Sequence, residues 1–213
     1  MSTVVVIDYG TSNLRSVAKA LDYVAGKQHR IIVSDKAEQI RSADRIVFPG
    51  QGAIGQCMQS LREKGLDNLI AESIKTKPFL GICLGLQSLM DMSDEDGGTK
   101  GLGIIPGRVI RFKNNIKDGK GDTCKIPHMG WNQVVQSQTH ALWNGIENGA
   151  RFYFVHSYYV VPSNQADTAA TTDYAASFTS AAARDNIFAT QFHPEKSQKA
   201  GLILLKNFLE WEP

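Results

Sequence analysis

Short apolar runs alternate with segments of helical periodicity through the first half of the chain. Residues 3–7 form a β-branched and almost entirely apolar run, which is typical of a strand buried on both faces of a parallel sheet. In the next segment, residues 13–24, Leu14, Val17 and Leu21 recur at the spacing of one helix face. The same alternation predicts strands over residues 31–33, 45–48 and 79–83, and helices over residues 37–43, 53–75 (broken near Gly65) and 84–92. Repeated strand–helix units predict a mostly parallel sheet with helices on both faces.

The second half of the chain differs, because turns rather than helices separate most of its apolar runs. Its pattern predicts strands over residues 108–112, 132–135, 151–161, 169–174, 178–183 and 187–192. A closing helix is expected over residues 200–211, with Leu202, Leu205, Phe208 and Leu209 facing inward. Because such strands pair antiparallel, we expect an antiparallel portion added to the parallel sheet. The predicted fold is α/β, with three layers, and residues 1–213 form a single domain without repeats or linkers.

Composition and charge narrow the classes of function. The chain has 213 residues, of which 42% are hydrophobic and 21% charged, as expected for a globular protein with a full core. The formal net charge is +2 and no block of Lys or Arg accompanies it. A surface for nucleic acid or an anionic membrane is therefore not expected.

The cysteines and the first residues indicate a cellular compartment. Cys57, Cys83 and Cys124 are an odd number at wide spacings with no C-x-x-C pair, which favours reduced thiols and argues against a zinc site. The first residues lack the basic segment of a signal peptide, and no apolar stretch approaches the length of a membrane span. These features predict a soluble cytoplasmic protein, and we expect neither a metal ion nor a cofactor.

The strongest chemical motif is Gly-x-Cys-x-Gly at residues 81–85, between a predicted strand and a predicted helix. This is the cysteine form of the nucleophile elbow, in which glycines permit a sharp turn around a strained nucleophile. Cys83 would lie at a helix N-terminus, where the helix dipole favours a thiolate. The backbone N–H of Leu84 would point toward a developing oxyanion. A buried structural cysteine at the end of a strand is the alternative interpretation.

A second motif, His193-Pro194-Glu195, follows the last predicted strand. Strand ends on one edge of a doubly wound sheet meet at one crevice, so His193 is expected near Cys83 as a base that Glu195 orients. Helix capping alone would also explain this motif. His128 and His156 lie near other strand ends and compete with His193 for the role of base.

A third motif, Pro-Gly-Gln-Gly-Ala at residues 49–53, ends the third predicted strand. Two glycines around Gln51 let the backbone turn a peptide N–H toward a ligand at little steric cost. The segment is either a simple turn or the second donor of an oxyanion hole, and the residues alone do not separate these two interpretations.

Together these motifs resemble the class I, triad-type glutamine amidotransferases. The resemblance rests on Gly-Ile-Cys-Leu-Gly-Leu-Gln at residues 81–87 and on His-Pro-Glu at residues 193–195. Within that family the chain is similar to the glutaminase subunits of imidazole glycerol phosphate synthase. This narrower similarity rests on Asp-Tyr-Gly-Thr-Ser-Asn-Leu-Arg-Ser-Val at residues 8–17, Pro-Gly-Gln-Gly at residues 49–52, Ile-Pro-His-Met-Gly-Trp-Asn at residues 126–132 and Val-His-Ser-Tyr at residues 155–158.

The resemblance implies hydrolysis of L-glutamine to glutamate and ammonia through a glutamyl thioester on Cys83. His193 would accept the thiol proton and later protonate the departing ammonia, and Glu195 would orient the imidazole. The oxyanion would bind the backbone N–H groups of Leu84, Gln51 and Gly52. Family members hold the glutamine with residues that match Gly50, Gly52, Gln87, Ser157 and Tyr158 in this chain.

The resemblance also implies a partner protein. Ammonia would pass to a (β/α)₈-barrel cyclase/synthase subunit that forms a heterodimer with this chain. That subunit makes imidazole glycerol phosphate and aminoimidazole carboxamide ribotide in histidine biosynthesis. The family's docking surface matches Asn13, His128, Met129 and Trp131, and a tryptophan suits an interface anchor.

Two positions depart from the family pattern. Ser12 stands where glycine is common, and Gln51 stands where valine is common in the oxyanion strand. The family gates this strand by a peptide flip that depends on the partner, so Gln51 bears on the balance between the two states. Neither departure lies in the Cys-His-Glu triad.

Alternative functions belong to three classes. A relative serving anthranilate or aminodeoxychorismate synthase would have the same chemistry, but the segments at residues 126–132 and 155–158 argue against it. A non-catalytic interaction module with this fold is disfavoured because Cys83, His193 and Glu195 are all present. A cysteine peptidase of related fold is disfavoured by the sequence around Cys83.

Overall fold

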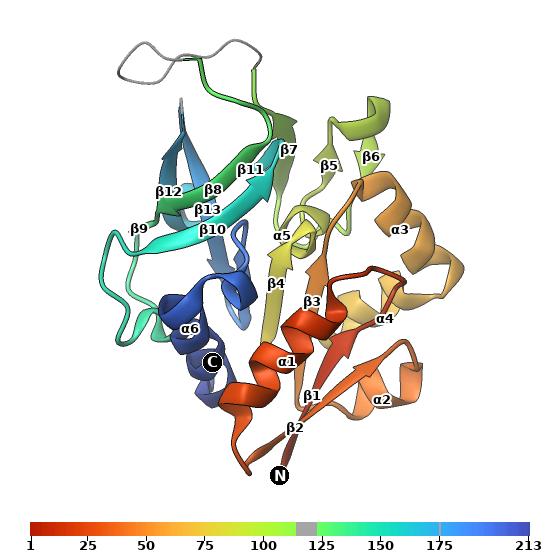
Figure 1. Cartoon of the computed structure of the whole chain (residues 1–213). Helices are drawn as coiled ribbons and strands as arrows, with labels where there is room; N and C mark the ends of the chain where they lie inside the picture. Colours follow the sequence, from red (N-terminus) through yellow and green to blue (C-terminus); the bar gives the residue numbers. More distant parts are fainter. Residues whose placement is uncertain (114–122, 175) are drawn as a thin grey trace.

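The computed structural model describes residues 1–113, 123–174 and 176–213, and a large mixed sheet runs through it (Figure 1). Its parallel part contains β1 (Ser2–Ile7), β2 (His29–Ser34), β3 (Arg45–Gly50), β4 (Phe79–Cys83) and β14 (Ile187–Thr190). The remaining strands are β5 (Met92–Ser93), β6 (Thr99–Lys100), β7 (Gly107–Arg111), β9 (Val135–Gln136), β11 (Tyr158–Pro162), β12 (Thr168–Tyr174) and β13 (Ala176–Arg184). Within the described residues the strand order is β2-β1-β3-β4-β14-β13-β11-β7-β5-β6, with β12 on β13 and β9 on β12.

A separate two-stranded ribbon consists of β8 (His128–Gln133) and β10 (Arg151–His156), which pair antiparallel. The helices are α1 (Leu14–Ala25), α2 (Ala37–Ser42), α3 (Ile54–Glu63), α4 (Leu66–Ser73), α5 (Leu84–Ser88) and α6 (Gln198–Glu210). Short 3₁₀ turns in the described part of the chain are η1 (Glu95–Gly97), η2 (Ala141–Trp143), η3 (Gln165–Asp167) and η4 (Pro194–Lys196). None of the described helices has both the length and the apolar character that a bilayer crossing requires.

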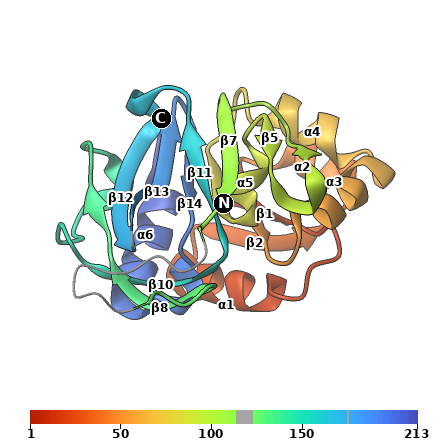
Figure 2. The same ribbon diagram turned by 90° about the horizontal axis from the view of Figure 1, so that it is seen from above.

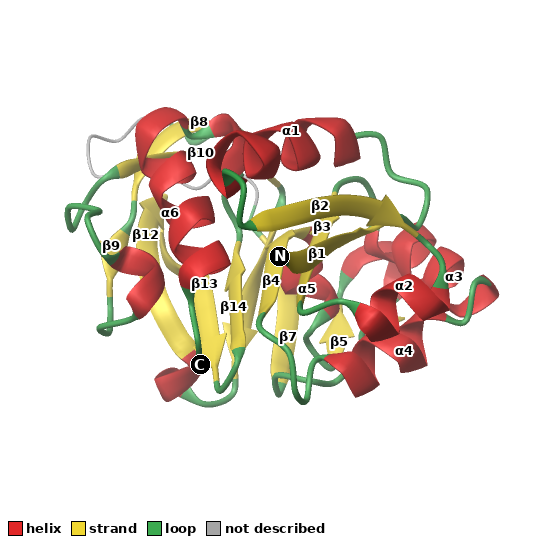
Figure 3. Cartoon of the chain, turned by 90° about the horizontal axis from the view of Figure 1, so that it is seen from below, coloured by secondary structure: helices red, strands yellow, loops and turns green. Residues whose placement is uncertain are grey.

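Alternation along β1 explains the layers of the molecule. Successive strand residues point to opposite faces of a sheet. Val4 and Val6 accordingly pack with residues of α1, α6 and the β8–β10 ribbon, whereas Val5 and Ile7 pack with residues of α2 to α5. Figures 2 and 3 show the ribbon on the same side of the sheet as α1 and α6. The predicted α/β fold, with a mostly parallel sheet and an antiparallel portion, is confirmed.

Several predicted boundaries were wrong. The expected strand over residues 151–161 is two strands in different sheets, because β10 pairs with β8 and β11 pairs with β7 and β13. The predicted helix over residues 84–92 ends at Ser88, and the strand predicted to stop at Phe48 continues to Gly50. β14 ends at Thr190 rather than at residue 192, and on α6 Leu204 is buried whereas Leu202 is only half-buried.

Candidate active site

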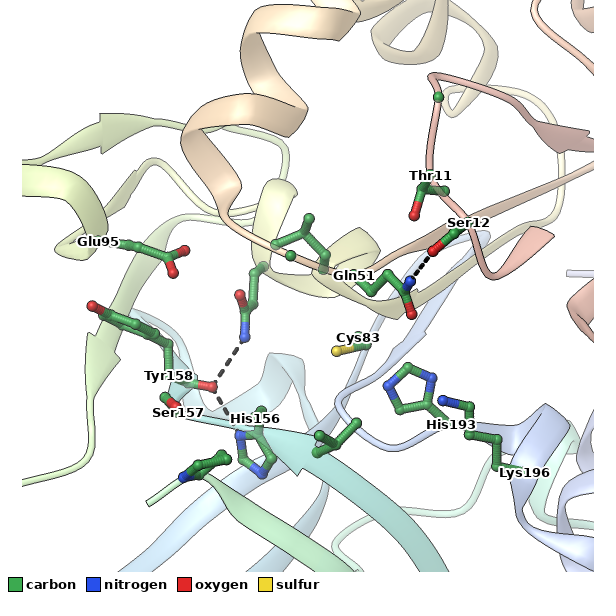
Figure 4. Close-up of a pocket in the computed structure, with 16 residues that line it drawn as sticks. Thr11, Ser12, Gln51, Cys83, Glu95, His156, Ser157, Tyr158, His193 and Lys196 are labelled. Atoms are coloured by element: carbon green, nitrogen blue, oxygen red, sulfur yellow. Dashed lines mark hydrogen bonds between the residues drawn. The ribbon is translucent and has the colours of Figure 1, made fainter.

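The carboxyl ends of β1, β3, β4 and β14 meet at one edge of the sheet and form a pocket of about 680 Å³ (Figure 4). Residues 10–12 follow β1, Gln51 and Gly52 follow β3, Cys83 ends β4, and His193 follows β14. The opposite side is lined by residues 155–158, at the junction of β10 and β11. Because the carboxyl ends of parallel strands lie at the same edge of the sheet, the residues that follow these strands come together there although they are far apart in sequence.

Cys83 occupies a strained turn between β4 and α5. Its backbone has φ 54° and ψ −103°, a region that residues with a side chain seldom adopt. The flanking glycines allow the close packing of this turn. A Cβ on Gly85 would lie 2.0 Å from the Phe48 carbonyl oxygen, and one on Gly81 would lie 2.9 Å from the Cβ of Ala189. The Gly-x-Cys-x-Gly pattern is therefore a steric requirement of this elbow, and the Cys83 side chain faces the pocket.

His193 and Glu195 form a buried pair beside Cys83. Nδ1 of His193 lies 2.8 Å from Oε1 of Glu195, and both side chains are almost fully buried. The His193 backbone is anchored because its N–H donates to the Tyr153 carbonyl and its own carbonyl accepts from the Ser197 hydroxyl. Among the described residues, Nε2 of His193 has no hydrogen-bond partner. With Nδ1 held by the carboxylate, Nε2 is the nitrogen left to exchange a proton.

The charges around His193 favour the imidazolium. Burial alone lowers the pKa of His193, but the nearby Cys83 thiolate and the Glu195 carboxylate outweigh burial and raise the pKa to about 10. The His193 imidazole therefore keeps its proton at neutral pH and can donate it to a group bound beside Cys83.

Ser12 and Gln51, the two residues that differ from the pattern expected at their positions, contact each other. Nε2 of Gln51 donates a hydrogen bond to Oγ of Ser12, which joins the loop after β3 to the loop after β1 (Figure 4). Gly52 has φ 93°, which glycine adopts without penalty. A Cβ on Gly50 would lie 2.5 Å from the Tyr9 hydroxyl and 2.7 Å from the Cβ of Leu84. The segment at residues 50–52 thus packs directly against the elbow.

Polar side chains on the floor of the pocket connect its two sides. Nε2 of Gln87 lies 3.0 Å from the Tyr158 carbonyl oxygen and 3.2 Å from Oε1 of Gln191. Nε2 of Gln191 lies 3.7 Å from Sγ of Cys83. The sequence analysis did not single out Gln191, although a polar residue at the end of an apolar run and next to His193 was an available signal.

Glu95 is a second pocket residue that the sequence analysis missed. It belongs to η1, and its Oε2 accepts a hydrogen bond of 2.9 Å from the backbone N–H of Ile54, the first residue of α3. Burial raises the pKa of this carboxyl, and the hydrogen bond from Ile54 opposes that effect. Glu95 lies in an acidic loop whose sequence gives no sign that it reaches the pocket.

The residues expected at a docking surface are not equivalent. Met129 and Trp131 are exposed on β8, at 62% and 38%. His128 is buried between Tyr174 and Phe154, with ring centroids 3.9 Å and 4.8 Å away, and Asn13 is also buried. Alternate residues of β8 face opposite sides, so His128 points inward where Met129 and Trp131 point outward. The assignment of these four residues to a docking surface stays a prediction.

A strained cysteine elbow and a buried histidine–carboxylate pair, at the carboxyl edge of a mostly parallel sheet, are the arrangement that α/β enzymes with a cysteine nucleophile use. The family model "Glutamine amidotransferase class-I" matches residues 5–211, so the chain belongs to the class-I glutamine amidotransferase family.

Comparison with individual proteins shows which members of this family the chain is similar to. The chain is 57% identical to "Imidazole glycerol phosphate synthase subunit HisH" of Nitrosococcus oceani over 211 residues, which cover 99% of this chain and 98% of that protein. It is 54% identical to the subunit of the same name from Nitrosomonas europaea, and the alignment covers all of both chains.

Solved structures show the same fold at lower identity. One, described as a glutamine amidotransferase, has a TM-score of 0.70 at 16% identity and covers 97% of each chain. A glutamine amidotransferase from Thermotoga maritima has a TM-score of 0.64 at 16% identity and covers 93% of this chain and 78% of that one.

Proposed function

We propose that this chain is the glutaminase subunit of imidazole glycerol phosphate synthase, and that it hydrolyses L-glutamine to glutamate and ammonia with Cys83, His193 and Glu195. The observation that carries the proposal is the strained Cys83 elbow in one pocket with the buried His193–Glu195 pair. The family membership and the full-length similarity to two HisH subunits support the choice of substrate and of assembly.

The first half of the reaction forms a thioester. The Cys83 thiolate attacks the side-chain amide carbon of glutamine, and the carbonyl electron pair moves onto the oxygen. Backbone N–H groups of Leu84, Gln51 and Gly52 donate hydrogen bonds to this oxyanion. Donors that are already in place lower the activation barrier most where negative charge develops in the transition state. The tetrahedral intermediate then collapses, the carbon–nitrogen bond breaks, and His193 transfers its Nε2 proton to the leaving nitrogen. Ammonia and a glutamyl thioester result.

The second half of the reaction restores the enzyme. A water molecule attacks the thioester carbon and gives a proton to Nε2 of His193. The carbon–sulfur bond breaks, Cys83 leaves as a thiolate, and glutamate is released. Throughout both halves Glu195 accepts the Nδ1–H of His193, which fixes the ring and stabilises its positive charge.

The rest of the pocket suits the α-amino-acid end of glutamine. Backbone groups at Gly50, Gly52, Ser157 and Tyr158, together with the side chain of Gln87, would hold the substrate in place. The Glu95 carboxylate is the pocket group whose charge complements the substrate's α-ammonium.

The ammonia requires an acceptor on a second protein. We assign that role to a (β/α)₈-barrel cyclase/synthase subunit in a cytoplasmic heterodimer. Met129 and Trp131 form the exposed part of the proposed docking surface, on the same strand as the buried His128. An exposed tryptophan beside an exposed methionine is a combination enriched at protein interfaces.

Glutamate release from glutamine tests the proposed function. The full chain is assayed alone and then together with the barrel subunit and its nucleotide substrate. Strong stimulation by the two together, absent in Cys83→Ala, supports a gated glutaminase of this synthase. Activity that ignores the partner would preserve the Cys83 chemistry but contradict the assigned acceptor. No glutamate release from the complex would contradict the glutaminase assignment itself.

The docking surface is tested by Trp131→Ala. Truncating an anchor residue at an interface costs about 2 kcal/mol or more, which corresponds to roughly a 30-fold weaker complex. Titration calorimetry with the barrel subunit measures the dissociation constant. Val161→Ala is the matched control, because Val161 is comparably exposed, at 44%, but lies on β11. Equal affinities for the two variants would remove Trp131 from the interface.

A further inference from the structure

Two buried histidines, His156 in the wall of the pocket and His128 behind it, have no role in the proposed reaction. His128 on β8 and His156 on β10 face each other in the register of the ribbon, and Nδ1 of His128 lies 2.9 Å from Nε2 of His156. Only 3% of His128 and 6% of His156 is exposed. The described residues offer no group of three or more metal-ligating side chains there, and the nitrogen separation is that of a hydrogen bond.

The direction of each hydrogen bond follows from chemistry. Nδ1 of His156 lies 2.8 Å from the Tyr158 carbonyl oxygen, and since a carbonyl only accepts, this nitrogen carries the proton. Burial lowers the pKa of His156 to about 3, outweighing that hydrogen bond, and lowers the pKa of His128 to about 4. Both rings are therefore neutral near pH 7 and carry one N–H each.

The remaining protons are then determined. Nε2 of His156 has no proton and accepts, so Nδ1 of His128 donates to it. Nε2 of His128 in turn accepts from Nδ2 of Asn132, at 3.3 Å. Both histidines are thus Nδ1–H tautomers, and every ring nitrogen has a partner of the correct kind.

This hydrogen-bond chain meets the pocket at the Tyr158 carbonyl. Nε2 of Gln87 donates to that oxygen from the pocket side, and Figure 4 shows His156 contacting the same oxygen. The same Gln87 amide donates to Gln191, and Gln191, which is fully buried, directs its own amide N–H at Sγ of Cys83. A continuous series of contacts therefore links Asn132, on the strand that exposes Trp131, to the thiol.

We propose that His128 and His156 are positioning residues, which fix the Tyr158 carbonyl and through it the Gln87 and Gln191 amides that hold the Cys83 thiol in place. The proposal rests on the glutaminase function proposed above. A positioning role is distinct from packing, although the His128 ring also stacks on Tyr174 and Phe154. Small misplacements of a reacting group are costly to the rate, so loss of this support should be measurable at Cys83.

Two substitutions at His128 separate hydrogen bonding from packing. His128→Phe keeps a flat ring between Tyr174 and Phe154 but removes the donor to His156. His128→Asn loses the ring but keeps an amide N–H near the place of Nδ1. We expect kcat/KM for glutamine, measured with the full chain and its partner subunit, to fall about tenfold or more in His128→Phe and less in His128→Asn. The reverse order, or wild-type values in both, would overturn the proposal.

His140→Phe is the matched control. His140 is also a neutral histidine, since burial lowers its pKa to about 4, and it packs against Phe188 and Trp211. Its Nδ1 accepts from the backbone N–H of Leu142, and it lies in a different part of the molecule from the Cys83 pocket. This variant should keep wild-type kcat/KM. A loss equal to that of His128→Phe would show that any such substitution disturbs the site.

Two further readouts do not depend on glutamine hydrolysis. Alkylation of Cys83 by iodoacetamide, followed on its peptide by mass spectrometry, should slow in the same order, with His128→Phe slowest. Nitrogen-15 NMR of the wild-type histidine rings should show neutral Nδ1–H tautomers at both His128 and His156. An Nε2–H tautomer at either ring would overturn the proposal. If the variants alkylate in this order but the wild-type chain releases no glutamate in the complex, the proposed function is contradicted while the positioning role stands.

Discussion

The pocket has two walls that the chain builds in different ways. The parallel-strand wall, made of Ser12, Gln51, Cys83 and His193, consists of residues that end or follow β1, β3, β4 and β14 of one sheet. The ribbon wall, made of residues 155–158 and backed by His128, lies where the chain leaves the β8–β10 ribbon and enters the large sheet. In the proposed reaction the first wall carries the nucleophile and the proton carrier. The second contributes backbone groups and neutral rings.

In the proposed scheme, the reactive and the positioning groups therefore have opposite electrostatic surroundings. On the parallel-strand wall, charged neighbours overcome burial and keep the His193 imidazolium, with a pKa of about 10. On the ribbon wall, burial dominates and keeps His128 and His156 neutral, with pKa values of about 4 and 3. A charged group transfers protons readily, whereas a neutral ring with both nitrogens satisfied keeps one orientation.

The largest effect should come from the parallel-strand wall. Cys83→Ala removes the nucleophile and should lower glutamine hydrolysis by at least about 10⁴-fold, because the remaining groups form no thioester. Glutamate release by the complex measures the loss. Thermal unfolding should change little, since alanine occupies the same backbone conformation with less bulk. Substantial residual activity would show that the nucleophile lies elsewhere. The parallel-strand wall would then no longer differ from the ribbon wall in carrying the reactive group.

Glu195→Gln should have the next largest effect. Loss of the carboxylate leaves His193 wrongly oriented, and kcat/KM should fall by about 10²- to 10⁴-fold. Because Glu195 is one of the groups that raise the pKa of His193, the alkaline limb of the kcat/KM profile should also move to lower pH. Glu210→Gln, at an exposed residue of α6, is the control. An unshifted alkaline limb would show that Glu195 does not tune the imidazole.

Acid should destabilise the protein through the neutral histidines. Their folded pKa values lie below the ordinary 6.5, so stability is complete above pH 6.5 and falls as the pH drops toward 4, where the unfolded chain binds more protons. Each such histidine contributes about 1.4 kcal/mol per pH unit over that range. Urea unfolding between pH 7 and pH 4.5 should therefore show a smaller slope for His128→Phe than for wild type. An identical slope would mean that His128 is protonated in the folded protein.

The smallest effect is expected at the mouth of the pocket. The Gln51–Ser12 hydrogen bond is solvent-exposed, so its contribution to the free energy of unfolding should be about 0.5 kcal/mol. A double-mutant cycle of Ser12→Ala and Gln51→Ala, followed by urea unfolding, measures the coupling. A coupling of more than about 2 kcal/mol would show that the two loops act as one structural unit.

The two walls also differ in how well the sequence predicts them. Cys83 and His193 follow apolar strands, and the rule that parallel strand ends converge was enough to expect them together. The ribbon wall has no comparable rule. The largely aromatic and β-branched run from Arg151 to Val161 contains only His156 and Ser157 as a break, and this short break does not reveal that the chain changes sheets at Ser157. The contact between His128 and His156 depends on that change, so sequence reasoning left both as competitors for the catalytic base.

At the Cys83 turn, the residue that catalysis requires is not the residue that makes the folded protein most stable. A left-handed conformation costs a residue with a side chain about 1–3 kcal/mol, which the surrounding fold must absorb. Glycine would relieve that cost, so Cys83→Gly should be inert yet harder to unfold than wild type. A population of variants selected only for survival on heating would therefore drift toward loss of the thiol.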